Sequence, residues 1–269
     1  MPMQRMVAIA LGMAVVIAPL GSMAAGMQPA RAVEQQAAAA ANSLLNQGRQ
    51  QAEQGELEAA IATYSQAIQA DATSAEAYFH RGIAYHDLGD YQLAIADFSR
   101  ALQLRPDHSE TLYNRGEAHA HMTNAEAAIA DLTQAIELAP DVVQPYLDRG
   151  LVLAATGNLP QALSDLDSVI ALAPDNADAH YNRGKIYTEM GNPEAALSDF
   201  NTALRLNPEL AEAYGNRGIL QHQLGDSQAA LADLRQAAAL FQAQGDSQGY
   251  QQTLYFMQQV QQEGSEQAP

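Results

Sequence analysis

The sequence contains no cysteine and no tryptophan, and Lys185 is its only lysine. The absence of cysteine excludes disulfide bonds, thiolate catalysis, thiol metal sites and a lipid-modified N-terminal cysteine. Basic residues are also scarce, with 13 against 31 acidic ones, so the formal net charge is -18. Because so acidic a surface repels phosphate groups, the composition argues against binding of nucleic acid or of an anionic membrane by charge.

Sequence signatures of catalysis are missing as well. No H-E-x-x-H, glycine-rich phosphate loop or nucleotide fingerprint occurs. The pairs His119/His121 and His80/His86 are two and six residues apart, and both spacings point the side chains in different directions on a helix. We therefore interpret the histidines as packing or surface residues, and we expect no metal, no cofactor and no enzyme activity.

The chain does contain a 34-residue unit that occurs six times, at residues 41–74, 75–108, 109–142, 143–176, 177–210 and 211–244. We number the positions of each copy from 1 to 34. Position 8 is always glycine, position 20 is always alanine, and position 24 is always tyrosine, phenylalanine or leucine. Small residues at two positions and a large one at a third let two helices approach closely and fill the space between them. A fixed period of this length is typical of a solenoid.

Each copy is predicted to be a helical hairpin. In the second copy Tyr78, Gly82 and Tyr85 are spaced i, i+4, i+7, which is the period of one helix face. Gly89 marks a turn, and a second apolar helical pattern follows it. Proline at position 32 of four copies then ends the second helix. A single hairpin cannot bury its apolar side, so the copies must stack on one another.

This pattern resembles the tetratricopeptide repeat (TPR) and covers residues 41–244. The resemblance implies an all-α fold, an α-solenoid in which six hairpins form a right-handed superhelix. It also implies a non-catalytic scaffold that binds a peptide segment or a protein partner in its concave groove. The sequence departs from the pattern at Thr123, which replaces the turn glycine, and at Ala72 and Gln242, which replace the proline.

Residues 1–32 have the layout of a secretory signal peptide. Arg5 supplies a positive start, residues 7–20 are uncharged and largely apolar, and Ala30-Arg31-Ala32 offers a cleavage site. An uncleaved N-terminal anchor is the alternative. Residues 33–40 are expected to lead helically into the first repeat. The alanine- and glutamine-rich composition resembles that of exported TPR proteins of cyanobacteria, which implies a location in the periplasm or the thylakoid lumen.

A further helix is predicted after the last repeat, over residues 245–263. Tyr250, Leu254, Met257 and Val260 form an apolar stripe on it. We interpret this helix as a cap over the open apolar end of the stack, although a helix that docks a partner would carry the same stripe. Residues 264–269 are expected to be disordered.

The TPR resemblance places positions 5, 6 and 9 of each first helix on the concave wall. Position 6 is asparagine in four copies, and an amide can both donate to and accept from a peptide backbone. The alternative is that these asparagines bond only within the solenoid. Arg49 and Lys185 are the only basic residues at position 9, which argues against clamping of an acidic tail. The candidate partner-binding residues are Asn46, Phe79, His80, Tyr113, Asn114, Tyr181, Asn182, Lys185 and Asn216.

A repeated charge pattern also runs through copies two to six, with arginine at position 7 and aspartate at position 23. The first copy has Gln47 and Thr63 there, so both charges are missing together. We predict that the arginines and aspartates pair between helices, within one hairpin or with the next. Independent surface charges are the alternative.

Two other functions remain open at this stage. A membrane-tethered assembly factor would hold a complex together through the uncleaved N-terminus. A binding component for a small ligand, such as a glycan or a pigment, would use the same groove. The sequence does not identify the partner.

Overall fold

The computed structural model describes the backbone of residues 22–266 and the side chains of residues 36–263. This part of the chain forms thirteen helices and no strand, so the predicted all-α fold is confirmed. The helices are α1 (Ser22–Glu53), α2 (Leu57–Ala70), α3 (Ala75–Asp87), α4 (Tyr91–Leu104), α5 (Ser109–His121), α6 (Ala125–Leu138), α7 (Val143–Ala155), α8 (Leu159–Leu172), α9 (Ala177–Glu189), α10 (Pro193–Leu206), α11 (Ala211–Gln223), α12 (Ser227–Gln244) and α13 (Ser247–Glu266).

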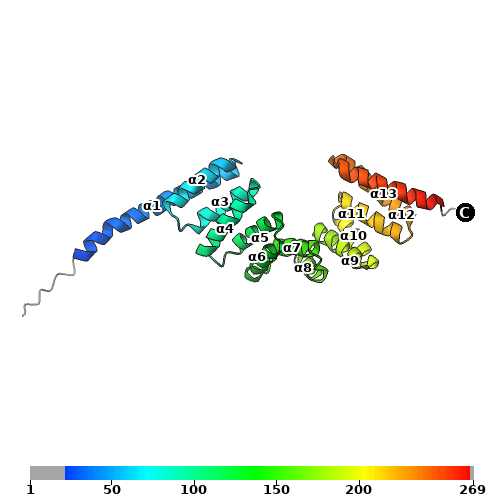
Figure 1. Cartoon of the computed structure of the whole chain (residues 1–269), viewed down its shortest axis with the longest axis horizontal. Coiled ribbons are helices and arrows are strands. Elements are labelled where there is room, and N and C mark those ends of the chain that lie inside the picture. The colour runs from blue at the N-terminus through cyan, green and yellow to red at the C-terminus, as the bar shows by residue number, and fades with distance from the viewer. Residues whose placement is uncertain (1–21, 267–269) are drawn as a thin grey trace, which may run out of the picture.

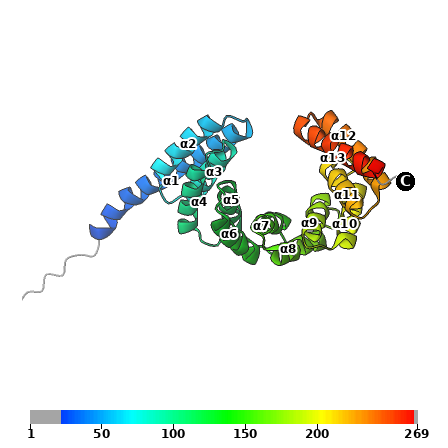
Figure 2. The same ribbon diagram turned by 45° about the vertical axis from the view of Figure 1, so that its right-hand side comes forward.

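Consecutive helices pair into six antiparallel hairpins, and the hairpins stack in sequence order into an arch (Figures 1 and 2). Each odd-numbered helix also touches the next odd-numbered helix, from α1 to α13, whereas no two even-numbered helices touch in the described part. The odd-numbered helices are therefore crowded on the inside of the curve, as Figure 2 shows for α5, α7 and α9. Positions on their inner side form the concave wall.

Close approach within a hairpin depends on the glycine at position 8. A Cβ atom added to Gly82 would lie 2.6 Å from Cε1 of Phe98, and one added to Gly48 would lie 2.5 Å from Cε1 of Tyr64. The helix has no room for a methyl group there because the ring at position 24 lies directly against the backbone. Gly150 is less constrained, since its nearest neighbour would be Cβ of Asp165 at 3.3 Å.

The turns inside the hairpins use a left-handed residue at position 15. Gly89 has a φ of +82°, and the other turn glycines are similar. Thr123 occupies this position in the third hairpin with a φ of +56°, and it is the only non-glycine residue with positive φ in the described part of the chain. A β-branched residue is strained there.

The two ends differ in part from expectation. The lead-in segment 33–40 belongs to the single helix α1, while residues 1–21 of the predicted signal segment lie outside the described residues. Among the described helices, none is both long and apolar enough to cross a membrane.

At the other end α13 packs against α11 and α12, with Val260 buried beside Ala230 and Leu234. The prediction of disorder from residue 264 is wrong for 264–266, because α13 continues through the helix-forming residues Gln261, Gln262 and Glu263 to Glu266. Residues 267–269 lie outside the described part.

Candidate partner-binding groove

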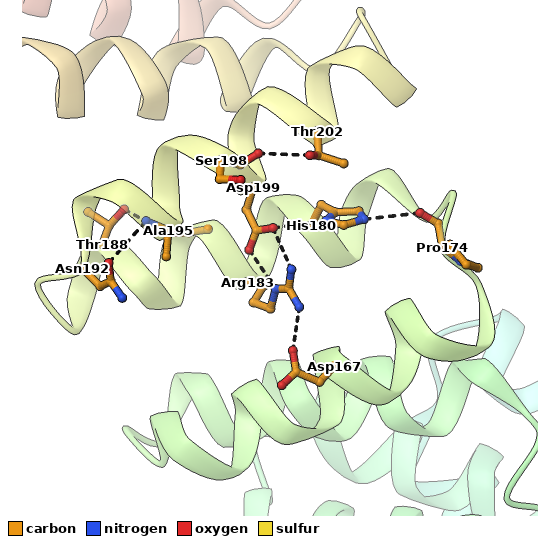
Figure 3. A network of polar contacts seen from close by, with 11 residues as sticks. Asp167, Pro174, His180, Arg183, Thr188, Asn192, Ala195, Ser198, Asp199 and Thr202 are labelled. Carbon is orange, nitrogen blue, oxygen red and sulfur yellow. Dashed lines mark hydrogen bonds and ion pairs between the residues drawn. The ribbon is translucent and has the colours of Figure 1, made fainter.

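The orientation of the inner helices is fixed by a network of arginines and aspartates. In the fifth hairpin the Arg183 guanidinium donates two hydrogen bonds to Asp199, from Nε to Oδ2 and from Nη2 to Oδ1, both 2.8 Å long (Figure 3). Its Nη1 donates to Oδ1 of Asp167 on α8, in the preceding hairpin, at 2.6 Å. These hydrogen bonds, with Asp199 the largest contributor, raise the pKa of Arg183. One side chain thus joins three helices.

The same arrangement occurs in every hairpin from the second to the sixth, and we call it the polar spine. The predicted pairing is confirmed, and it lies within one hairpin, while the contact to the preceding hairpin goes to position 25. The paired aspartates are 4–8% exposed, so the bidentate pairs are shielded from water. The pairs are Arg81–Asp97, Arg115–Asp131, Arg149–Asp165, Arg183–Asp199 and Arg217–Asp233, and the position-25 acceptors are Ser65, Ser99, Thr133, Asp167 and Asn201.

Near its amino-terminal end, the wall holds a cavity of about 250 Å³ that Arg49, Phe79, His80 and His108 help to line. Phe79 is only 7% exposed, and its ring lies 5.2 Å from that of His108 and 6.2 Å from that of Phe98. It therefore serves mainly as a core residue. Burial, followed by the nearby Arg49 cation, lowers the pKa of His80. Asn46 is exposed on α1 and does not line this cavity.

The middle of the wall carries a half-buried acidic cluster. The Tyr113 hydroxyl interacts with the carboxylates of Asp148 and Glu117, and burial raises the pKa of this tyrosine. Burial also raises the pKa of Asp148 above its ordinary value, although the hydrogen bond from Tyr113 opposes the shift. Asn114 donates from Nδ2 to the Glu110 carbonyl oxygen at 2.7 Å, a bond within its own helix.

Near the carboxyl-terminal end, α9, α11 and α13 line a cavity of about 190 Å³ that includes Tyr181, Asn216, Ile219 and Phe256. Nδ2 of Asn216 donates to the Tyr181 hydroxyl at 3.0 Å and so orients both side chains. Burial raises the pKa of Tyr181 to about 12, which keeps its hydroxyl neutral. Phe256 remains 37% exposed although it lines the cavity.

Two further predicted residues border this end of the wall. Nδ2 of Asn182 donates to the Asp178 carbonyl oxygen, one helical turn earlier, at 2.8 Å. Nζ of Lys185 lies 5.5 Å from the centre of the Tyr181 ring, within the range of a cation–π interaction.

The structure thus divides eight of the nine predicted residues among three places along the arch. Tyr181 and Asn216 share the cavity with Phe256, whereas the neighbouring Asn182 and Lys185 line a separate cavity against α7. Tyr113 and Asn114 lie in the middle of the wall, Phe79 and His80 lie near the other end, and Asn46 stands apart. Sequence reasoning missed Phe256, because this residue is not part of the apolar stripe by which α13 was recognised. The signal was present, since Phe256 is a large apolar residue outside that stripe.

Family comparisons agree with this architecture. Sequence models of the TPR repeat match residues 48–89 and 152–191, and models of the tetratricopeptide repeat match 75–108, 109–142, 177–210 and 200–232. Together they cover more than half of the 269 residues. The chain therefore belongs to the tetratricopeptide-repeat family. No curated protein sequence matches it.

Solved structures of other proteins also show the TPR fold. YrrB, described as a TPR protein with an unusual peptide-binding site, is 29% identical with a TM-score of 0.59, over 63% of this chain and 88% of its own. The MamA protein is 25% identical with a TM-score of 0.60, over 64% of this chain and 94% of its own. PilF of Pseudomonas aeruginosa, 18% identical with a TM-score of 0.67 over 80% and 97%, shares the fold. TPR proteins are generally non-catalytic scaffolds.

Proposed function

We propose that the chain is a non-catalytic scaffold that binds an extended peptide segment along its concave wall, at α9, α11 and α13. The observation that carries this proposal is the exposed ring of Phe256 in the cavity that Tyr181 and Asn216 also line. An exposed aromatic ring beside oriented polar groups is the usual composition of a binding hot spot. The peptide-binding site described for YrrB supports the same class of ligand.

The sizes of the cavities at Phe256 and Phe79 favour a peptide over a buried small molecule at these two places. The cavity at Phe256 holds about 190 Å³ and the one at Phe79 about 250 Å³. Sites that enclose a small molecule usually span roughly 300–1,000 Å³. Each cavity instead suits one side chain of a segment that continues along the wall.

The asparagines supply the polar half of such a site. Nδ2 of Asn182 and of Asn216 each donates one bond within the solenoid, and neither Oδ1 accepts a hydrogen bond from the described residues. Each oxygen is therefore available to accept a backbone N–H of a bound peptide. Because the amide nitrogens are already held, the oxygens are oriented before the peptide arrives, which lowers the entropic cost of binding.

A peptide library tests this proposal without knowledge of the natural partner. Peptides are selected from a displayed random library on the immobilised chain, and their affinities for soluble protein are measured by fluorescence anisotropy. We expect Phe256→Ala to weaken the selected peptides by about 2 kcal/mol, the size of a hot-spot contact. Asn182→Ala should cost about 1 kcal/mol for one lost hydrogen bond.

Gln134→Ala, an exposed change on the outer helix α6, is the matched control and should leave affinity unchanged. Thermal melting of each variant separates a lost contact from a damaged fold. Peptides whose affinity responds to Gln134→Ala but not to Phe256→Ala would overturn the proposal. So would lost stability of Asn182→Ala with unchanged affinity, which would make the asparagine purely structural.

We also propose that the chain is exported and that the segment before Val33 is removed. The support is the charged start, the apolar run and the small residues at Ala30 and Ala32. Removal takes away Arg5 and Arg31 but no acidic residue, so the net charge changes from -18 to -20. Intact-mass measurement on the exported protein tests this. A full-length mass in the membrane fraction would instead favour the membrane-tethered assembly factor.

A further inference from the structure

Two histidines and a glutamate from two neighbouring repeats meet on the inner wall between α3 and α5. His86 comes from α3, and Glu117 and His121 come from α5. One ligand atom from each of the three residues can be chosen so that all three atoms lie within 4.8 Å of one another. His86 and His121 are 35 residues apart, which is one repeat plus one residue. For that reason the comparison of histidines within single repeats, which predicted no metal site, did not pair them.

The spacing is close to that of a metal centre. Nε2 of His86 lies 4.0 Å from Oε2 of Glu117. Nitrogen and oxygen ligands about 2.1 Å from a tetrahedral Zn²⁺ ion lie about 3.4 Å from one another. Glu117 and His121 are one helical turn apart on α5, so they project from the same face toward α3. Small side-chain rotations would bring the three ligand atoms to coordination distance.

The two imidazoles are already held in place. The ring of Tyr91, at the start of α4, stacks on His121 with centroids 4.5 Å apart and planes 3° apart. The same ring meets His86 edge-on at 5.2 Å. A metal site needs such support, because ligands whose rotamers are fixed lose less entropy on coordination.

One polar atom of the cluster, Nε2 of His86, lacks a hydrogen-bond partner among the described residues. Nε2 of His86 is buried and makes no hydrogen bond, whereas Nδ1, on the other side of the ring, lies 3.8 Å from Oδ1 of Asp87. A buried polar atom without a partner is unfavourable, and a metal ion would satisfy it. A carboxylate on the far side of a ligating imidazole is also the common support of such ligands.

We propose that His86, Glu117 and His121 bind a divalent transition-metal ion, Zn²⁺, with water completing the coordination. Two imidazoles and one carboxylate suit this ion, and the neighbouring Asp148 carboxylate adds favourable charge. His121 is exposed, so the ion can enter from the groove. The bound ion joins the second repeat to the third and stabilises the stack at that interface. This proposal does not depend on the peptide site at α13.

The test uses the full chain without a polyhistidine tag. Zn²⁺ is titrated by isothermal calorimetry, and Co²⁺ absorption reports the geometry of the bound ion. We expect one ion per chain with a tetrahedral Co²⁺ spectrum. His121→Ala and Glu117→Gln should each weaken affinity at least about tenfold, since even the loss of a supporting residue has an effect of that order. At the same Zn²⁺ concentration, the melting temperature of the wild type should rise more than that of Glu117→Gln.

His222→Ala is the matched control. His222 occupies the same repeat position as His86, and its Nε2 lies 3.0 Å from Oε2 of Glu263, but the described residues offer it no second histidine. This variant should bind Zn²⁺ as the wild type does. Absence of binding to the wild type would overturn the proposal. Equal affinity of wild type and Glu117→Gln, or one ion shared by two chains, would do so too.

Discussion

The polar spine and the concave wall use the repeat in opposite ways. In the spine, arginine and aspartate recur at the same positions through five hairpins, and each arginine makes the same bidentate pair with its aspartate. On the wall, position 6 changes from Asn114 to Asp148 and back to Asn182, and the interactions change with it. Recurrence therefore marks the contacts that hold the stack, and variation marks the places where one hairpin differs from the next.

The two ends of the stack show where the polar spine stops. Among the described residues no hairpin precedes the first one, and Thr63 there donates to Oε1 of Gln51 at 2.7 Å in place of an ion pair. At the other end, position 25 of the sixth repeat is Arg235, which cannot accept from a further arginine. The spine therefore requires a neighbour on one side and an acceptor on the other.

The largest test of the comparison breaks the spine in the fourth hairpin. Asp165→Ala leaves the Arg149 guanidinium without its bidentate partner, and we expect a loss of about 3–5 kcal/mol in the free energy of unfolding. Thr63→Ala in the first hairpin should cost only about 1 kcal/mol, since it removes one neutral hydrogen bond. Urea unfolding followed by circular dichroism measures both.

A double variant shows whether the spine residues act as a pair. Arg149→Ala combined with Asp165→Ala should cost less than the sum of the single losses. Additive losses below about 0.5 kcal/mol would mean that the two charges are independent. Gln134→Ala, an exposed change on α6, is the control for a substitution that removes no buried contact.

The second test asks whether the glycine at position 8 has the same structural role in every hairpin. Gly82→Ala places a methyl group 2.6 Å from Cε1 of the fully buried Phe98, and we expect a loss of about 1–3 kcal/mol from overpacking. Gly150→Ala meets its nearest neighbour at 3.3 Å and gains helix propensity, so it should be close to neutral. Equal losses in thermal melting would show that space at position 8 is not the cause.

The sequence predicted the recurring part of this structure well. The period gave the hairpins, and the shared loss of charge at Gln47 and Thr63 indicated that arginine and aspartate pair. It did not predict the contact from Arg183 to Asp167, because the acceptors at position 25 differ in chemistry from repeat to repeat.

The wall was harder to predict for a geometric reason. Its contacts join different positions of neighbouring repeats, as in Asn216 with Tyr181, or join a repeat to α13, as in the cavity at Phe256. A comparison of equivalent positions does not reveal such pairs. The burial of the Phe79 side chain was not predicted, because position 5 lies at the margin between the concave wall and the core.

The third test concerns the turn in which Thr123 departs from the repeat. Thr123→Gly relieves the strain of a left-handed β-branched residue, which exceeds the cost of the more flexible unfolded chain, so we expect a gain of about 0.5–1 kcal/mol. The reciprocal change Gly157→Thr, at the same position of the next repeat, should lose a similar amount. A loss of stability from Thr123→Gly would show that the threonine side chain makes a compensating contact.

The smallest expected effect comes from restoring asparagine on the wall. Asp148→Asn keeps an acceptor for the Tyr113 hydroxyl while it removes a half-buried charge beside Glu117. We expect a gain near neutral pH of about 0.5 kcal/mol, the usual upper range for a change outside the core. The converse change Asn182→Asp should lose stability, since its carboxylate would face the Asp178 carbonyl oxygen in place of a donor.

The pH dependence of that gain identifies its cause. Burial raises the pKa of Asp148 in the folded chain, so the folded state binds this proton more tightly than the unfolded state does. Wild-type stability should therefore improve relative to Asp148→Asn as the pH falls from neutral through the raised pKa, and the gap between the two chains should close at acidic pH. Chemical unfolding at a series of pH values measures the gap. A gap that stays constant across the series would mean that the gain comes from packing and not from the buried charge.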